Sequence, residues 1–131
     1  MEKIKKTFVS HEKALLSLEQ ILNLSEDPIV RDASIQRFEY TVETFWKLLK
    51  IYLYDHEGLE CNSPKSCMRK AFEVGLFDDT EAENALFMCN DRNLTSHTYI
   101  EAVAKIIYKR LPLYASIMRS CTEKIRPVAE V

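Results

Sequence analysis

The stretch DPIVRDASIQRFEYTVETFWKLLKIYLYDHEG, residues 27–58, decides the fold class of this chain. Asp27 suits a helix N-cap, Pro28 suits the first helical position, and Gly58 suits the residue that follows a last turn. Between these signals, apolar residues recur at steps of three and four, which is the spacing of one helix face. The residues in this series are Ile35, Phe38, Val42, Phe45, Leu49 and Tyr52. The stretch therefore predicts one long helix over residues 28–56.

The apolar surface of this helix is wider than a single stripe, because Trp46, Leu48 and Leu53 add to it. A stripe of that width contacts more than one neighbour. The neighbours can be other helices of a bundle or a second subunit, and the pattern alone leaves both alternatives open.

Shorter helices are predicted on either side of the long one. Apolar residues at helical spacing between Ile4 and Leu22 predict a first helix, with His11 on its stripe as a boundary residue beside the core. The pair Ser63-Pro64 repeats the cap-and-proline signal, and Gly75 ends the short helix that follows.

Two further helices complete the predicted bundle. Asp78 and Asp79 place negative charge at the start of a fourth helix, where the helix dipole favours it. Thr98 and Glu101 match the capping box S/T-x-x-E and predict the start of the last helix. We expect residues 126–131 to form a frayed C-terminal tail.

The composition is that of one soluble domain. The chain has 131 residues, of which 47% are apolar and 29% charged, with a formal net charge of -2. Two glycines and four prolines are too few for a turn-rich β fold. We therefore predict an all-α antiparallel bundle of four to five up-and-down helices over residues 1–125, without a global basic field for nucleic acid.

The cysteines Cys61, Cys67, Cys89 and Cys121 form no CxxC pair, so zinc binding is not predicted. We expect them to be small apolar residues in a reducing compartment. No signal peptide is visible, and no apolar run approaches the roughly 18 residues of a membrane span. The prediction is a cytoplasmic protein that binds no metal and no cofactor.

The segment DRNLTSHTY, residues 91–99, holds the residues best suited to catalysis or to ligand binding. Arg92 offers a planar cation for phosphate oxygens, and His97 can take and return a proton near neutral pH. On a continuous helix these side chains would point about 140° apart, so they can meet one ligand only if the chain breaks between them or if they act across a subunit interface. The predicted cap at Thr98 supplies that break.

This pair suits metal-independent cleavage of RNA, with His97 as the base for a 2′-hydroxyl and Arg92 stabilising charge on the phosphate. Hydrogen bonds from Asn93, Thr95 and Ser96 could orient the phosphate. The spacing R-x4-H is by itself a weak pattern, and a solvated polar turn is the plain alternative.

Three blocks in the same order carry a family resemblance: RDASIQRFEYTVETFWKLLKIYL (31–53), SPKSCMRKAFEVGLFDD (63–79) and DRNLTSHTY (91–99). The chain resembles the nucleotidyltransferase substrate-binding proteins of the HEPN superfamily, including the HepT-like toxins of toxin–antitoxin pairs. The resemblance implies an antiparallel helical bundle, a two-fold homodimer, and a complex with a minimal nucleotidyltransferase encoded by a neighbouring gene.

The resemblance also implies roles for single residues through the motif R-x4-H-x-Y, which Arg92, His97 and Tyr99 match. In one interpretation Arg92 and His97 form a ribonuclease pair, and the transferase silences it by adding AMP to Tyr99. In the other the chain is a non-catalytic subunit that holds a nucleotide or substrate for the transferase. Cationic side chains that could steer RNA are Lys65, Arg69, Lys70, Lys105, Lys109 and Arg110.

Overall fold

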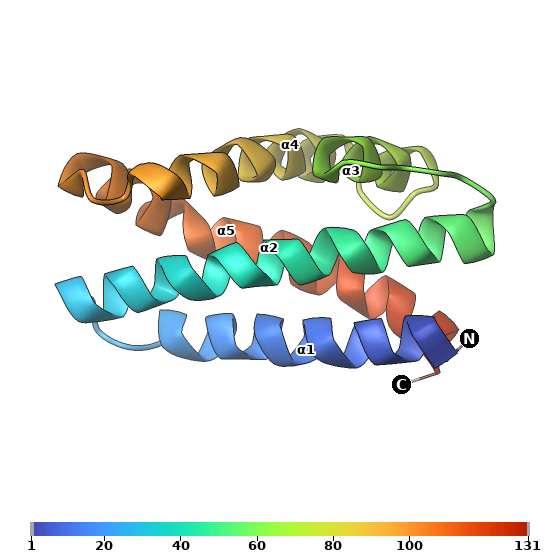
Figure 1. Cartoon of the computed structure of the whole chain (residues 1–131), viewed down its shortest axis with the longest axis horizontal. Coiled ribbons are helices and arrows are strands. Elements are labelled where there is room, and N and C mark those ends of the chain that lie inside the picture. Colours follow the sequence, from blue (N-terminus) through green and yellow to red (C-terminus); the bar gives the residue numbers. More distant parts are fainter. Residues whose placement is uncertain (1, 131) are drawn as a thin grey trace.

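The computed structural model describes residues 2–130, and within them every regular element is a helix (Figure 1). The elements are α1 (Glu2–Leu22), α2 (Pro28–Glu57), α3 (Pro64–Glu73), α4 (Asp79–Leu94), the 3-10 turn η1 (Thr95–His97) and α5 (Glu101–Ala129). The consecutive helices α1 and α2 run antiparallel, as do α4 and α5. The predicted all-α bundle is confirmed.

The long helix α2 is the centre of the molecule, because it packs against α1, α3, α4 and α5. Both of its predicted ends are confirmed. The side chain of Asp27 accepts a hydrogen bond of 2.8 Å from the backbone N–H of Val30, and Gly58 adopts the left-handed conformation with φ of 65°. Its wide apolar surface is therefore used inside the bundle by several neighbours at once.

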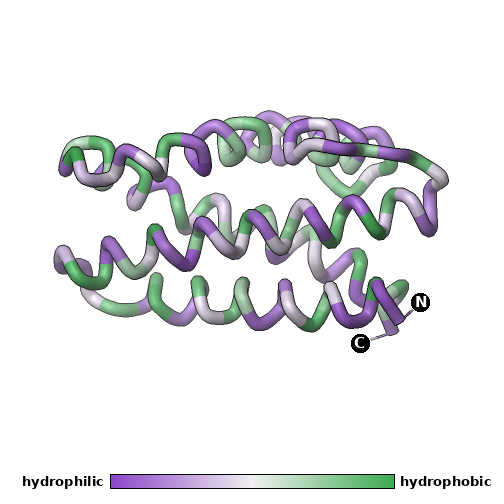
Figure 2. The backbone as a smooth tube through the Cα atoms, viewed as in Figure 1, coloured by the Kyte–Doolittle hydropathy of each residue, from purple (hydrophilic) through white to green (hydrophobic). Residues whose placement is uncertain are grey.

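All five α-helices contribute to one apolar core, and Figure 2 shows apolar positions recurring along each of them. Aromatic rings form its middle: Phe38 of α2 stacks on Tyr114 of α5 with a centroid distance of 5.7 Å. Trp46 is half-buried and packs against this core from the edge of α2. Burial of these large side chains supplies most of the drive for assembling the bundle.

The position of His11 corrects our prediction of a boundary residue, because its side chain is completely buried. Its Nδ1 lies 2.9 Å from the Thr44 hydroxyl and its Nε2 lies 3.0 Å from the Thr122 hydroxyl. Burial lowers the pKa of His11 to about 4, so the ring is neutral at physiological pH. We call these three side chains the His11 layer, since they join α1, α2 and α5.

The C-terminal end of α5 also differs from the prediction of a tail that frays from residue 126. The helix continues to Ala129, which is buried, and residue 131 lies outside the described residues. Arg126 explains the extension: its guanidinium bonds to Glu12 of α1 and Glu123 of α5 and lies 5.0 Å from the centroid of the Phe8 ring. These contacts tie the last turns to α1.

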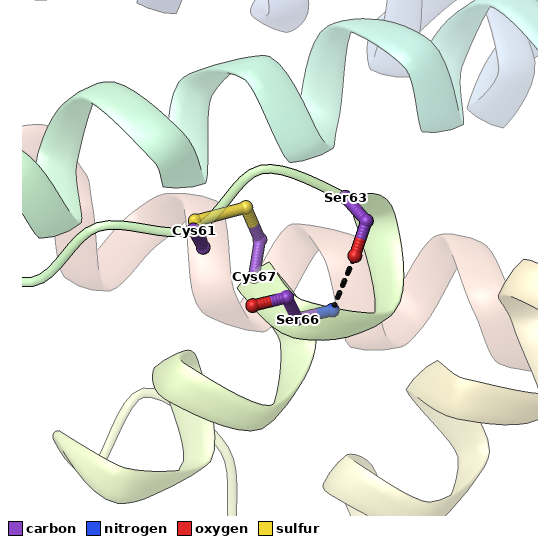
Figure 3. Close-up of a disulfide and its surroundings, with 4 residues drawn as sticks. All are labelled: Cys61, Ser63, Ser66 and Cys67. Atoms are coloured by element: carbon purple, nitrogen blue, oxygen red, sulfur yellow. Dashed lines mark hydrogen bonds between the residues drawn. A yellow bond between two sulfur atoms is a disulfide. The ribbon is translucent and has the colours of Figure 1, made fainter.

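The cysteines follow the prediction only in part. Cys89 and Cys121 are buried thiols, and burial raises the pKa of Cys89 to about 11. Cys61 and Cys67, which we expected to be unpaired, form a disulfide across the loop that leads into α3 (Figure 3). Their spacing of six residues carries no recognised pairing signal, and only the fold of the loop brings the two together.

Among residues 2–130, no helix has the length and apolar content required to cross a membrane.

Candidate functional site

The segment 91–99 lies where α4 gives way to α5, at the end of the bundle that also holds the α1–α2 connection (Figure 1). Helix α4 ends at Leu94, η1 adds a single 3-10 turn, and α5 begins only at Glu101. Between Arg92 and His97 the chain therefore tightens from α to 3-10 helix but does not break, and it first becomes extended at Ile100.

The predicted capping box at Thr98 is not formed. This residue has a helical backbone conformation (φ -74°, ψ -5°) instead of the extended one that an N-cap adopts, and its hydroxyl donates to the Thr95 carbonyl. Ile100 occupies the N-cap position of α5 without a side-chain hydrogen bond. Glu101 instead lies 3.0 Å from Lys105 and 3.9 Å from Arg31 of α2. Thr98 therefore closes η1 and does not open α5.

Arg92 is held by α2 and by its own turn. Its Nε donates to the backbone carbonyl of Glu39 at 3.2 Å, and its Nη1 donates to the Thr95 hydroxyl at 3.1 Å. The carboxylate of Glu39 lies 3.7 Å from Nη1. About a third of the side chain stays exposed, 35%, so the guanidinium is positioned but can still meet a ligand.

The three predicted phosphate-orienting residues have different surroundings. Thr95 is buried, and its hydroxyl donates to the Arg92 carbonyl at 2.7 Å while it accepts from the Arg92 guanidinium. Ser96 is exposed and donates to the Asn93 carbonyl at 3.2 Å. Asn93 is exposed as well. Thr95 thus positions Arg92, whereas Ser96 and Asn93 face solvent.

His97 and Tyr99 lie together at the tip of the bundle. Their rings meet edge to face with centroids 6.1 Å apart, and neither ring is buried. Tyr99 is the extreme case, with 81% of its surface exposed. Such an aromatic side chain does not pack on the bundle, so the plain alternative of a packing residue does not describe it. Within residues 2–130, the Arg92 guanidinium and the His97 ring share no hydrogen bond.

A comparison with protein-family models matches residues 6–126 to the family described as nucleotidyltransferase substrate binding protein like. The chain belongs to this family. The resemblance read from the three sequence blocks is thereby confirmed at the level of the family.

Two solved structures share this fold. A protein of Thermus thermophilus is 51% identical, with a TM-score of 0.86 over 88% of this chain and 98% of its own. A Haemophilus influenzae protein, described as showing the fold of a substrate-binding domain of a nucleotidyltransferase, shares the fold at 19% identity. Its TM-score is 0.62 over 95% of this chain and 98% of its own. Curated protein sequences gave no significant match.

One cluster of polar side chains beside the motif, formed by Asp91, Arg110 and Tyr114, was not predicted from the sequence. The carboxylate of Asp91, which is buried, accepts a hydrogen bond of 2.5 Å from the Tyr114 hydroxyl and bonds of 2.9 and 3.1 Å from Arg110. Burial and the Asp91 charge raise the pKa of Tyr114, so its hydroxyl remains a donor. The sequence offered only a weak signal for this cluster, an Asp inside a helix, because it is the burial of Asp91 that requires a partner.

The cluster fixes α5 against α4 immediately before the motif and occupies Arg110, one of the candidates for steering RNA. Lys105 is paired with Glu101, and Lys70 lies 3.9 Å from Glu73. Across residues 2–130, no group of three His, Cys, Asp or Glu side chains is arranged to hold a metal ion.

Proposed function

We propose that this chain is the helical partner subunit of a minimal nucleotidyltransferase and acts as a metal-independent ribonuclease that the transferase silences by adding AMP to Tyr99. The observation that carries the proposal is the tip of the bundle, where His97 and the strongly exposed Tyr99 lie side by side. The positioned Arg92 supports it from the preceding helical turn. Family membership supports the transferase as partner.

In the proposed cleavage, a ring nitrogen of His97 takes the proton of a ribose 2′-hydroxyl. The 2′-oxygen forms a bond to phosphorus while the bond to the 5′-oxygen breaks, which leaves a 2′,3′-cyclic phosphate and a 5′-hydroxyl. Arg92 stabilises the charge that develops on the phosphate oxygens. The leaving oxygen needs a proton, and a two-fold dimer would supply it from the second copy's His97.

In the proposed silencing, the Tyr99 hydroxyl attacks the α-phosphate of ATP on the transferase, AMP becomes bonded to the tyrosine oxygen, and pyrophosphate leaves. The proton of the hydroxyl passes to a base of the transferase. An exposure of 81% lets another protein reach this hydroxyl. The attached phosphodiester would carry its charge next to His97 and within reach of Arg92, where it competes with the RNA phosphate.

The test is cleavage of RNA by the purified chain in the presence of a chelator, compared with His97→Ala and Arg92→Ala. The proposal expects cleavage by the wild type, loss in both variants, and loss after co-expression with the cognate transferase. Mass analysis of the co-expressed chain should then localise one AMP to the peptide that contains Tyr99. An inert wild-type chain, free of AMP, would refute the ribonuclease.

A second function is favoured by a different observation, a cavity lined by Arg92 and Asn93. A subunit that holds a nucleotide or substrate for the transferase needs such a cavity but needs neither His97 nor Tyr99. This function predicts nucleotidyl transfer that requires both chains and survives Tyr99→Phe. Loss of AMP incorporation into this chain in that variant supports the first function instead.

A further inference from the structure

The cavity beside the motif is formed by α2, the start of α3 and α4, and its volume is about 440 Å³. Arg92 and Asn93 line it from α4, Trp46 lines it from α2, and residues 63–65 form the opposite wall. Cavities of a few hundred Å³ hold small organic ligands. Arg92 therefore belongs both to the motif and to a cavity that could take a ligand next to it.

The charged groups of this cavity favour an anion. Lys65 and Arg92 contribute two cations, and Glu43 contributes the one carboxylate among the lining residues. Glu43 is already occupied, because it accepts from the Trp46 indole N–H at 3.1 Å and lies 3.4 Å from Lys47. Among residues 2–130, Lys65 has no ion pair, and the Arg92 Nη2 donates no hydrogen bond. Lys65 and the Nη2 of Arg92 thus remain available to a phosphate, whereas the Arg92 Nη1 lies 3.7 Å from the Glu39 carboxylate.

The aromatic wall favours a planar base. Trp46 is the only tryptophan of the chain, and its bond to Glu43 fixes the orientation of the indole. It packs on the core with one part of its surface and lines the cavity with another. Stacking of a nucleobase on such a ring is favourable and tolerant of sequence.

The third wall is preorganised. Residues 63–65 lie inside the short loop that the Cys61–Cys67 disulfide closes, and the backbone N–H of Ser66 donates to the Ser63 hydroxyl at 3.2 Å (Figure 3). Both ends of the loop are buried, since Cys61 is 2% and Cys67 is 0% exposed. A wall held in this way fixes the backbone of Lys65, so that only its side chain has to be ordered at the moment of binding.

We infer that this cavity binds one nucleotide unit, with its base on Trp46 and its phosphate between Lys65 and Arg92. The inference rests on the proposed function for its substrate class and deepens it: the bound unit is the nucleotide of a single-stranded RNA that places the neighbouring linkage at the motif. Free AMP presents the same chemistry, and the test separates the two sources.

The test uses the fluorescence of Trp46, which as the only tryptophan reports stacking directly. His97→Ala protein, which does not cut its ligand, is titrated with a short single-stranded RNA and separately with AMP, with inorganic phosphate as the control ligand. The expected result is saturable quenching by RNA, and an affinity about tenfold weaker when Lys65→Ala is added. Lys13→Ala is the matched control, because Lys13 is an exposed lysine of α1 that does not line the cavity.

The outcomes separate the inference from the proposed function. Quenching by RNA but not by AMP assigns the cavity to the RNA chain, and quenching by both assigns it to nucleotides in general. Absence of quenching by either, or equal effects of Lys65→Ala and Lys13→Ala, overturns the inference even where the wild type cleaves RNA. Quenching that depends on Lys65 in a chain that cuts no RNA keeps the cavity and refutes the ribonuclease.

Discussion

His11 and His97 have opposite surroundings in the same bundle. His11 is fully buried in α1, and both of its ring nitrogens meet threonine hydroxyls of other helices. His97 is exposed on a single 3-10 turn, and its ring contacts only the edge of the exposed Tyr99 ring among the aromatic pairs of the described residues.

The difference separates polar groups that hold the fold from polar groups that are available for chemistry. A buried imidazole that uses both nitrogens can neither exchange protons with a ligand nor leave its place without loss of stability. An exposed imidazole contributes little to stability and can meet a substrate. The His11 layer and the motif therefore respond in opposite ways to perturbation.

The largest expected effect is on activity at the motif. We expect His97→Ala to lower RNA cleavage by about 100-fold to 10,000-fold, because general base catalysis contributes that much, while the free energy of unfolding changes by less than about 0.5 kcal/mol. Cleavage rates and urea unfolding measure the two quantities. His56→Ala, which changes an exposed histidine at the end of α2, is the matched control and should cleave as the wild type does.

The next effect is on stability at the His11 layer. We expect His11→Ala to lower the free energy of unfolding by about 3 kcal/mol, because it leaves a cavity and removes hydrogen bonds to Thr44 and Thr122. Urea unfolding measures the loss. A loss below about 1 kcal/mol would show that the layer adds little and would remove the contrast with His97.

The pH dependence of stability sharpens the same contrast. The pKa of His11 falls from 6.5 to about 4 on folding, so the unfolded chain binds the proton that the folded chain refuses. The contribution of the neutral His11 ring to the free energy of unfolding is present above pH 6.5 and is lost as the pH falls toward 4. Between pH 7 and pH 5 we expect a loss of about 2 kcal/mol, measured by urea unfolding.

The control for this pH dependence is His11→Gln. In this variant the free energy of unfolding should lack the part of its pH dependence that comes from the His11 ring. Salt-bridged carboxylates act at lower pH: Arg126 and Arg119 lower the pKa of Glu123 to about 2, so its contribution is lost below its usual value of 4.5. An unchanged slope between about pH 7 and pH 5 in His11→Gln would contradict the assignment to His11.

The smallest effect concerns the start of α4 and the residue that follows η1. Asp78 forms a capping box with Glu81, so Asp78→Ala should cost about 1 kcal/mol. Thr98 is not the N-cap of α5, and Thr98→Ala should change the free energy of unfolding by less than about 0.5 kcal/mol. Thermal unfolding of the two variants side by side measures the difference, and equal losses would restore Thr98 as a cap.

Local signals made most of the fold predictable. Each of Asp27 and Ser63 precedes a proline and caps its helix, and Gly58 and Gly75 end their helices with positive φ of 65° and 85°. The information in these signals lies within a few residues of each helix end, so the sequence reveals it directly. The prediction at Thr98 was wrong because its capping pattern competes with the hydrogen bond that closes η1.

Long-range contacts set the limit of such reasoning. The partners of His11 lie 33 and 111 residues away in the chain, and a stripe pattern cannot show that two threonines enclose it. In the site, the residue types were readable from the sequence, but the expected break between Arg92 and His97 is only a tightening from α to 3-10 helix. The anchoring of Arg92 on the Glu39 carbonyl, and the cavity that joins Arg92 to Trp46, depend on how α2 meets α4.

The two described ends of the chain lie together at the end of the bundle opposite η1 (Figure 1). Helix α5 alone, with 29 residues, separates its C-terminus from the motif by about 43 Å at 1.5 Å per residue. A dye, an affinity handle or a surface tether attached at either end therefore stands well away from His97 and Tyr99. Immobilised or labelled protein can therefore be used to test the proposed binding of RNA and of the transferase at the far tip without the attachment obstructing it.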